Sequence, residues 1–208
     1  MISFVYFDLG GVAICDFSAT NKWNELKRDL GINDKNEKKF EEIWERYENE
    51  ICVNRDVDTL VPIFHKELHL DLAKNYSFLL EGFVNRFEKN PSIWPVLQEM
   101  KKNTRLGLLT NAYPRMFEAI RKRGIQPNIE WDVLVDSSIE HLQKPDRRIF
   151  ELAEKKAGVK KEEILFVENS KGHVKAAQDF GWQTFLYDSS RSEKSSKDLM
   201  MFFNRTQI

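Results

Sequence analysis

Two acidic residues stand at the ends of short apolar runs, where a carboxylate can act as a nucleophile or hold a metal ion. Asp8 ends the run Ser-Phe-Val-Tyr-Phe-Asp, and Glu168 ends the run Glu-Ile-Leu-Phe-Val-Glu. If both runs are strands of one α/β sheet, their ends lie at its carboxyl edge, where such sheets bind ligands. Two carboxylates at that edge can share a divalent cation, and hard oxygen ligands suit Mg²⁺.

Two further polar motifs follow in the chain. Thr110-Asn111 ends another apolar run, and its hydroxyl and amide can bind a phosphoryl oxygen, although such a pair is also common in turns. Lys144 precedes Pro145, which suits the first turn of a helix, so the ammonium group can point at an anion just outside that helix. The order of the four motifs is a far more specific signal than any one of them.

The chain outside residues 16–90 alternates between short apolar segments and helix-like segments. This alternation predicts an α/β fold with a doubly wound parallel sheet. Gly124, Gly158 and Gly181 stand at the ends of three predicted helices, where a C-cap favours glycine. The predicted strands are 3–8, 105–110, 132–136, 163–168 and 183–187, and the predicted helices are 92–102, 113–123, 146–157 and 172–180.

Residues 16–90 are charged and predicted to be helical throughout. We therefore predict a core made of residues 1–15 and 91–208, with a helical cap, residues 16–90, inserted after the first strand. Because this insertion leaves and rejoins the core beside Asp8, we expect a lid that selects substrate and excludes water. Its predicted helices are 20–30, 36–51, 55–69 and 74–89.

The C-terminal segment has a different composition. Residues 189–198 are polar and are expected to be mobile, and residues 200–203 are expected to form a last helix or an edge strand.

Composition excludes several classes of partner. The 208 residues include 32 basic and 33 acidic side chains, so no strong field attracts nucleic acid or an anionic membrane. No apolar run approaches the length of a membrane span, and no signal peptide is recognised. The two cysteines, Cys15 and Cys52, are expected to be reduced thiols of a cytoplasmic protein. We expect a monomer or a dimer.

The four motifs and their order resemble the haloacid dehalogenase-like (HAD) hydrolase superfamily. The matching text is Phe-Asp-Leu-Gly-Gly-Val, Leu-Leu-Thr-Asn-Ala, Lys-Pro-Asp-Arg-Arg-Ile-Phe and Phe-Val-Glu-Asn-Ser, and it extends over nearly the whole chain. The 16–90 insertion lies where members of the family with a type 1 helical cap carry that cap. The resemblance implies a Rossmann-like core and a hydrolase. The Asp-Leu-Gly form of the first motif looks like the branch that acts on small phosphorylated metabolites such as sugar phosphates and nucleotides.

The resemblance also implies a role for each motif residue. Asp8 would attack phosphorus and form an aspartyl-phosphate, while Thr110 and Lys144 would hold the transferring phosphoryl group. The phosphate-binding residues implied by the resemblance are Thr110, Asn111, Lys144 and Gly11, and the implied Mg²⁺ ligands are Asp8, the main-chain carbonyl of Gly10, Glu168 and Asn169.

Three positions depart from the family pattern. Gly10 replaces a second aspartate that acts as general acid and base, a loss worth ~10²–10⁴-fold in rate. Asn169 replaces an aspartate, which removes a charge from the metal site. His173 stands where the family often has asparagine, and we interpret it as a histidine of a helix end or the surface. Asp16 and Asp56 are expected near the hinges of the insertion, where either could return the lost acid. Nothing in their spacing identifies one of them, so both are interpreted as solvated charges.

Three functional hypotheses follow. The first is a slow Mg²⁺-dependent phosphatase of a small phosphorylated metabolite. The alternative is a degenerate member of the family that binds a ligand or a protein without turnover, as Gly10 and Asn169 suggest together. The third is a metal-free 2-haloacid dehalogenase, although that branch usually has an aromatic residue at position 10 and a Ser-x-Asn sequence in its fourth motif.

Overall fold

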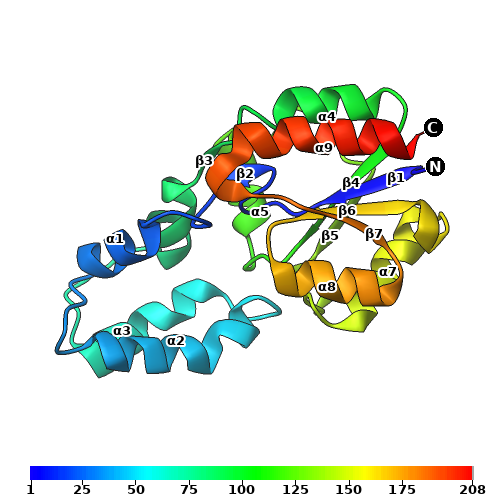
Figure 1. Ribbon diagram of the computed structural model, residues 1–208. Coiled ribbons are helices and arrows are strands. Elements are labelled where there is room, and N and C mark those ends of the chain that lie inside the picture. The colour runs from blue at the N-terminus through cyan, green and yellow to red at the C-terminus, as the bar shows by residue number, and fades with distance from the viewer. Residues whose placement is uncertain (208) are drawn as a thin grey trace.

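A five-stranded parallel sheet forms the centre of the structure, a computed structural model that describes residues 1–207 (Figure 1). The strand order is β5-β4-β1-β6-β7, so β1 lies in the middle and every residue of it is buried. The predicted α/β fold with a doubly wound parallel sheet is confirmed. The strands are β1 (Phe4–Phe7), β4 (Arg105–Thr110), β5 (Val133–Asp136), β6 (Ile164–Glu168) and β7 (Gln183–Leu186).

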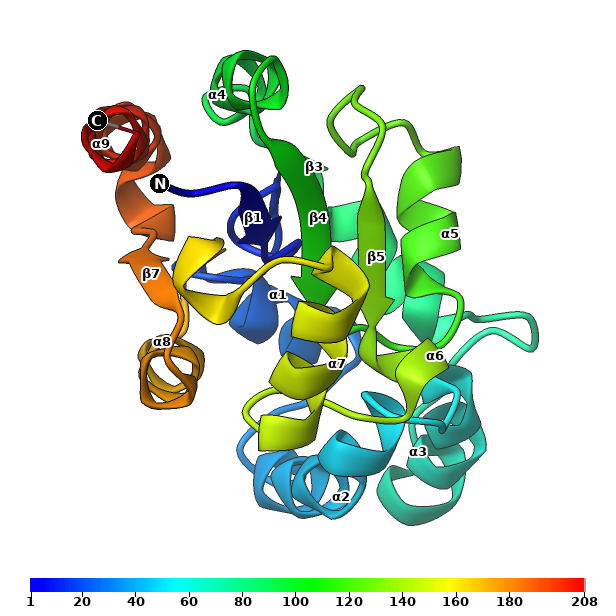
Figure 2. The same cartoon turned by 90° about the vertical axis from the view of Figure 1, so that its right-hand side faces the viewer.

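Helices cover both faces of this sheet. Figure 2 shows α4 and α9 on one side and α7 and α8 on the other. Side chains alternate between the two faces along β1, because successive residues of a strand point in opposite directions. Val5 and Phe7 join the apolar cluster under α4, whereas Phe4 and Tyr6 join the cluster under α7 and α8. The helices of the core are α4 (Trp94–Lys101), α5 (Met116–Lys122), α6 (Ser137–Glu140), α7 (Arg147–Ala157), α8 (Lys171–Phe180) and α9 (Ser192–Thr206).

The ends of the core helices follow from their sequences. Gly158 and Gly181 have positive φ angles of 66° and 106° and end α7 and α8, as the sequence predicts. At the other end of α7, the Asp146 carboxylate accepts a hydrogen bond from the Arg148 N–H at 2.9 Å and caps the helix. Pro145 therefore lies before this helix, and the prediction that it occupies the first turn is wrong.

The inserted segment carries three α-helices, which Figure 1 shows beyond one end of the sheet. They pack around an apolar cluster rich in aromatic rings, including Phe40, Phe64 and Phe78, whose side chains are fully buried. Two short strands, β2 (Ile14–Cys15) and β3 (Glu88–Lys89), pair antiparallel where the insertion leaves and rejoins the core. The helices are α1 (Lys22–Asp29), α2 (Glu37–Ile51) and α3 (Val61–Leu68).

Residues 74–89 do not form the predicted helix. The chain there makes a π-helical turn (Phe78–Phe83), a 3-10 turn (Val84–Arg86) and then β3. A Cβ atom on Gly82 would lie 2.5 Å from the ring of Phe78, so the missing side chain lets that ring fold back over the turn. The apolar spacing is helical, but local packing and the strand pair determine the backbone.

The C-terminal tail is ordered in α9, so the prediction of a mobile segment at 189–198 is wrong. Ser195 and Ser196 are buried, and Leu199 and Phe203 pack into the main apolar cluster. The Ser195 hydroxyl accepts a hydrogen bond from the Asp188 N–H at 2.8 Å. The composition of α9 is polar although one face of the helix is buried, because that face includes hydrogen-bonded serines beside Leu199 and Phe203. The expected helix at 200–203 lies within α9.

Two further features concern the whole described chain. Cys15 and Cys52 are both free thiols. Across residues 1–207, the helices are too short or too polar to cross a membrane.

Candidate active site

The carboxyl ends of three neighbouring strands bring Asp8, Thr110 and Glu168 together. In the sheet, Phe7 of β1 lies level with Leu108 of β4 and with Val167 of β6. Asp8 follows β1 directly, and Thr110 and Glu168 are the last residues of their strands. All three side chains are buried in spite of their polarity. The sheet register therefore gathers the predicted strand-end residues at one edge.

Lys144 reaches the same edge from the loop before α7. Its ammonium nitrogen lies 3.0 Å from Asp8 Oδ1 and 2.6 Å from Glu168 Oε2, and its side chain is buried. Asn111 holds the lysine backbone, because its amide donates to the Lys144 carbonyl and accepts from the Lys144 N–H, both at 2.9 Å. One N–H of this amide and its oxygen are thus engaged, while the second N–H of Nδ2 is left for a contact with a phosphoryl group. The predicted phosphate-binding role of Asn111 stays a prediction.

Glu168 is held by four contacts. Its Oε1 atom accepts hydrogen bonds from the N–H groups of Asn169 and Ser170, each at 2.9 Å. Its Oε2 atom contacts the Lys144 ammonium group and lies 3.2 Å from His173 Nδ1. Burial acts to raise the pKa of Glu168, but the lysine and the histidine outweigh it and lower this pKa to about 2. Direct binding of a metal by Glu168 would require the exchange of one of these contacts.

Asp8 has the opposite electrostatic balance. Burial raises the pKa of Asp8 to about 7, the charge of Glu168 adds to the shift, and Lys144 opposes it. The two carboxylates in turn raise the pKa of Lys144 in spite of its burial. The single positive charge of Lys144 thus lies between two carboxyl groups, so the cluster has no excess positive charge.

Gly10 is in close contact with a residue of the insertion. A Cβ atom on Gly10 would lie 2.3 Å from Asp16 Oδ2 and 3.1 Å from Asp16 Cγ. The other oxygen of this carboxylate accepts a hydrogen bond from the Ser18 N–H at 2.8 Å, which fixes its position. Burial raises the pKa of Asp16. The space that a side chain at position 10 would use is therefore filled by the Asp16 carboxylate.

Gly11 and Asn169 meet on the other side of the site. Gly11 has a φ angle of 72°, and a Cβ atom on it would lie 2.1 Å from Asn169 Nδ2. Ser189 joins the two, because its hydroxyl accepts from Asn169 Nδ2 at 3.0 Å and donates to the Gly11 carbonyl at 2.7 Å. The amide orientation of Asn169 is thereby set. The predicted phosphate-binding roles of Thr110 and Gly11 stay predictions.

The donor atoms at this edge can be tested for their fit to Mg²⁺. Within residues 1–207, no group of three or more His, Cys, Asp and Glu side chains is placed to hold a metal ion. Lys144 contacts only Oδ1 of Asp8, and the Asn169 nitrogen is held by Ser189, which leaves Asp8 Oδ2 and Asn169 Oδ1 as hard oxygen donors. With the Gly10 carbonyl, these are donors of the kind that suits Mg²⁺, which keeps several waters and binds through few carboxylates together with substrate phosphate.

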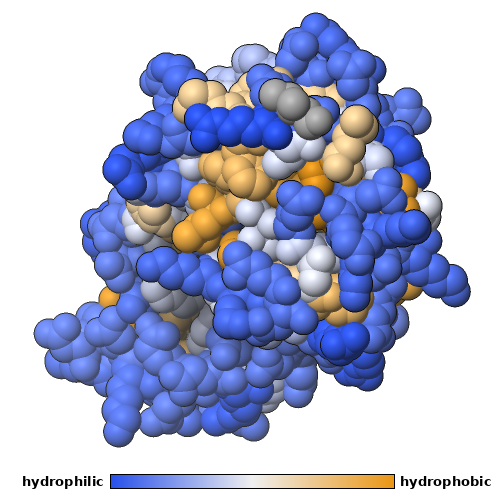
Figure 3. Space-filling model, turned by 45° about the vertical axis from the view of Figure 1, so that its right-hand side comes forward, coloured by the Kyte–Doolittle hydropathy of each residue, from blue (hydrophilic) through white to orange (hydrophobic). Residues whose placement is uncertain are grey.

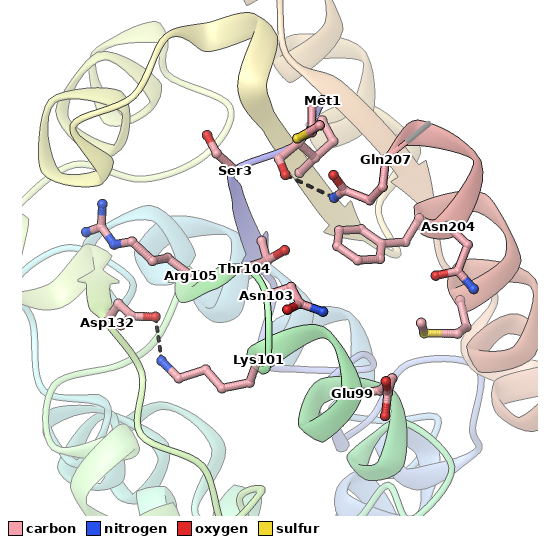
Figure 4. Close-up of a pocket in the computed structure, with 13 residues that line it drawn as sticks. Met1, Ser3, Glu99, Lys101, Asn103, Thr104, Arg105, Asp132, Asn204 and Gln207 are labelled. Carbon is pink, nitrogen blue, oxygen red and sulfur yellow. Dashed lines mark hydrogen bonds and ion pairs between the residues drawn. The ribbon is translucent and has the colours of Figure 1, made fainter.

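A cleft of about 720 Å³ lies at the opposite edge of the sheet. Figure 4 shows the residues that line it, between the starts of β1 and β4 and the end of α9. Figure 3 shows apolar atoms reaching an otherwise hydrophilic surface on this side of the molecule, and Ile2 and Phe203 are among the lining residues. Its charged pair, Lys101 and Asp132, is joined at 2.5 Å. No predicted site residue lines this cleft.

Sequence reasoning missed three residues of the site. The sequence predicts a peripheral histidine at position 173, but His173 lies one helical turn after Ser170, the N-cap of α8, and faces Glu168. The sequence also predicts a solvated charge at Asp16 and a mobile tail at Ser189, whereas the structure places Asp16 beside Gly10 and Ser189 against Gly11. Spacing could have indicated His173, because a residue in the first turn of a helix after β6 faces the strand end. Asp16 and Ser189 reach the site by tertiary packing alone.

Comparisons with known proteins agree with this arrangement. A sequence profile of the haloacid dehalogenase-like hydrolase family matches residues 4–181. An (S)-2-haloacid dehalogenase from Pseudomonas sp. strain YL is 30% identical over 122 residues, which cover 57% of this chain and 51% of that protein. The chain therefore spans about half the length of this relative.

Solved structures share the fold. A HAD family enzyme from Bacteroides thetaiotaomicron, in complex with magnesium and inorganic phosphate, superposes with a TM-score of 0.67 at 17% identity, covering 91% of this chain and 96% of that one. An L-2-haloacid dehalogenase from Xanthobacter autotrophicus gives 0.63 at 19%, covering 90% and 78%. The family profile spans most of the chain, and the resemblance recognised from the motifs is confirmed: the chain belongs to the haloacid dehalogenase-like hydrolase family.

Proposed function

We propose that this hydrolase is a slow, Mg²⁺-dependent phosphatase that acts on phosphate monoesters through Asp8. The observation that carries the proposal is the single ammonium group shared by two buried carboxylates. Because Lys144 is neutralised by Asp8 and Glu168, the three groups offer no net positive charge to an anionic substrate. A divalent cation would reverse this balance and make the edge attractive to a phosphate group.

The roles of the residues follow from their positions. Asp8 is the nucleophile, and the Lys144 contact with its Oδ1 atom holds the carboxylate in place. Asn111 fixes the lysine backbone and thereby the direction of the ammonium group. Mg²⁺, when bound by Asp8, the Gly10 carbonyl and Asn169, supplies positive charge that stabilises the phosphoryl oxygens. Thr110 is assigned to hold a phosphoryl oxygen.

The same geometry explains why turnover is expected to be slow. Position 10 has no side chain that could donate a proton to the leaving group. The loss of such a donor lowers the rate by ~10²–10⁴-fold when the leaving group is a poor one. Asn169 contributes an oxygen without a charge, so Mg²⁺ binding is expected to be weak before the phosphate arrives.

The test is phosphate release from p-nitrophenyl phosphate with Mg²⁺, compared between the wild type and Asp8→Asn. We expect at least a thousandfold loss in the variant, because a carboxamide is not a nucleophile. Asp132→Asn is the matched control, since this aspartate lies at the opposite edge of the sheet and should leave the rate unchanged. Equal background release by the wild type and Asp8→Asn would contradict the proposal.

A second candidate is a 2-haloacid dehalogenase, which the similarity to the Pseudomonas enzyme favours. Such an enzyme binds a carboxylate substrate. The Lys144 ammonium group does not attract a further carboxylate, because Asp8 and Glu168 already neutralise its charge. Chloride release from 2-chloropropionate in the presence of EDTA, lost in Asp8→Asn, would support this candidate. The absence of both phosphate and chloride release would favour the remaining hypothesis, a degenerate member of the family that binds a ligand or a protein without turnover.

A further inference from the structure

A small pocket of about 290 Å³ lies between the insertion and the core. Aromatic side chains from several segments form its walls. The principal ones are Phe17, Trp23, Trp44, Phe83 and Tyr113. We call this feature the aromatic pocket.

The rings of the aromatic pocket hold one another in place. The centroids of Trp23 and Trp44 lie 4.9 Å apart in an edge-to-face arrangement, and those of Phe83 and Tyr113 lie 5.0 Å apart. Phe17 joins them, with its centroid 5.4 Å from that of Phe83. Since Tyr113 follows β4 in the core while the other rings belong to the insertion, the pocket requires both parts of the chain. Such a preformed set of rings suits a flat aromatic group.

Two polar residues connect the aromatic pocket to the Asp8 site. Asp16 lines the pocket and fills the space beside Gly10. Asn111 lines it too and holds the backbone of Lys144. When the phosphorus of a phosphate monoester lies at Asp8, its leaving group would lie on the side of Gly10. The aromatic pocket begins on that same side.

The charge of the lining narrows the kind of leaving group. Among the residues that line the aromatic pocket within the described chain there is no Lys, Arg or His. The charged residue is Asp16, which repels a second phosphate or a carboxylate. Sugar bisphosphates, nucleotides with several phosphates and haloacids therefore fit the pocket poorly, whereas a neutral ring fits it well.

The missing acid at position 10 also favours an aromatic leaving group. A phenol ionises with a pKa of about 10, so a phenolate leaves from phosphorus without a proton donor more readily than an alkoxide does. Resting on the phosphatase activity proposed above, we propose that the substrate is a phosphate monoester of a phenol, with one ring or two fused rings seated in the aromatic pocket. Asp8 forms a bond to phosphorus, the bond from phosphorus to the aryl oxygen breaks, and its electron pair leaves on that oxygen. Water then releases inorganic phosphate from Asp8.

The test separates the effect of the ring from the effect of the leaving group. Phenyl phosphate has a ring and a good leaving group, benzyl phosphate has a ring and a poor one, and ethyl phosphate has neither. We expect KM for phenyl and benzyl phosphate to be about tenfold below that for ethyl phosphate, because the ring buries apolar surface. We expect kcat to be high for phenyl phosphate alone.

Trp23→Leu tests the pocket, and Trp94→Leu is the matched control because Trp94 lies at the start of α4 outside the aromatic pocket. We expect Trp23→Leu to raise KM for phenyl and benzyl phosphate about tenfold while leaving ethyl phosphate unchanged. Trp94→Leu should change none of the three. If all three substrates respond equally to Trp23→Leu while Asp8-dependent turnover persists, the inference is wrong and the phosphatase proposal stands.

A binding measurement covers the case in which no substrate is turned over. Calorimetry measures the binding of 1-naphthyl phosphate, in buffer that contains Mg²⁺, to two proteins. One is the Asp8→Asn variant, and the other is the double variant that combines Asp8→Asn with Trp23→Leu. About tenfold weaker binding in the double variant supports the aromatic pocket even if the phosphatase proposal fails. Equal binding by the two proteins, or none by either, contradicts it. Circular dichroism of each variant establishes that it is folded.

Discussion

The Asp16 carboxylate fills the space that a side chain at position 10 would need. The residue two positions after Asp8 has no side chain, and a carboxylate from the insertion lies where that side chain would start. Asp16 is held there by the Ser18 N–H. The absence of a side chain at position 10 is thus matched by its surroundings, and restoring an acid there requires more than one substitution.

Gly10→Asp alone is expected to destabilise the protein without creating a faster enzyme. The new Cβ atom would lie 2.3 Å from Asp16 Oδ2, so the Asp16 side chain must move, and two carboxylates would then meet in a buried place. Overpacking of this kind costs about 1–3 kcal/mol of unfolding free energy. Urea unfolding of the variant and the wild type measures the loss.

Gly10→Asp combined with Asp16→Gly should recover most of that stability. Turnover of benzyl phosphate should then rise by ~10²-fold or more over the wild type, because a proton donor again faces the leaving group. Asp16→Gly alone is the control for the space that is opened. An inert but folded double variant would show that the missing acid does not limit the rate.

The site residues that could be predicted are those whose position depends on a strand end. Asp8, Thr110 and Glu168 each follow an apolar run, and parallel pairing brings such ends to one edge whatever the rest of the chain does. Asp16 and Ser189 could not be predicted in this way. Their contacts with Gly10 and Gly11 depend on how the insertion and the tail pack, and a polar residue in a polar segment gives no sign of that.

At the scale of elements, an ion-pair cluster joins the insertion to the core. Arg115, which precedes α5, makes a two-pronged contact with Asp56, with both distances 2.7 Å, and a third contact with Asp58 at 2.8 Å. Asp58 also accepts a hydrogen bond from the Leu79 N–H at 2.8 Å. A second 3-10 turn, Val57–Leu60, precedes α3, and Asp56 is its N-cap. The cluster therefore connects this turn and the π-helical turn to the core.

Arg115→Met is expected to loosen this side of the insertion while leaving global stability nearly unchanged. The arginine is half exposed, so the free energy of unfolding should fall by less than about 1 kcal/mol. Hydrogen exchange in peptides that span residues 56–80 should speed up about two- to fivefold, and high salt should reduce the difference.

Arg121→Met is the matched control, because Arg121 pairs only within α5, with Glu118 at 3.0 Å. It should leave exchange in residues 56–80 unaffected. If both variants accelerate exchange equally, the contacts of Arg115 with Asp56 and Asp58 do not hold the insertion.

Elements of the core were predictable where one pattern dominates. The strands and the helices α7 and α8 follow from apolar periodicity and from glycine C-caps. The π-helical turn and α9 did not follow, because in each case the backbone depends on how a small residue packs. The Phe78 ring lies against Gly82 within the same turn, and Ser196 is buried beside Tyr187.

At the scale of the whole molecule, a buried polar network joins three distant parts of the chain. Asn90 Nδ2 donates to the Val12 carbonyl at 2.7 Å and to the Tyr187 hydroxyl at 3.0 Å. The same hydroxyl lies 2.8 Å from Ser196 Oγ and donates to the Ser192 carbonyl at 2.9 Å. The Asn90 amide and the Tyr187 hydroxyl together thus link the turn after β1, the end of the insertion and α9.

Tyr187→Phe should lower the free energy of unfolding by about 1–3 kcal/mol, because it leaves buried polar partners unsatisfied while it preserves the ring. Urea unfolding followed by fluorescence measures the change. Tyr76→Phe is the control, since its hydroxyl takes no part in this network. A change as small as that of the control would show that the network contributes no net stability.

The antiparallel pair of β2 and β3 has a consequence for how such a protein can diversify. Both crossings of the chain into the insertion pass through this pair, in which Ile14 lies opposite Lys89 and Cys15 opposite Glu88. Partner Cα atoms in such a ribbon are about 5 Å apart. Everything beyond the ribbon is therefore an exchangeable cassette with adjacent ends, and a recombination event can replace it without redirecting β1 or moving Asp8. The core can therefore be inherited unchanged while the cassette, and with it most of the walls of the aromatic pocket, is replaced.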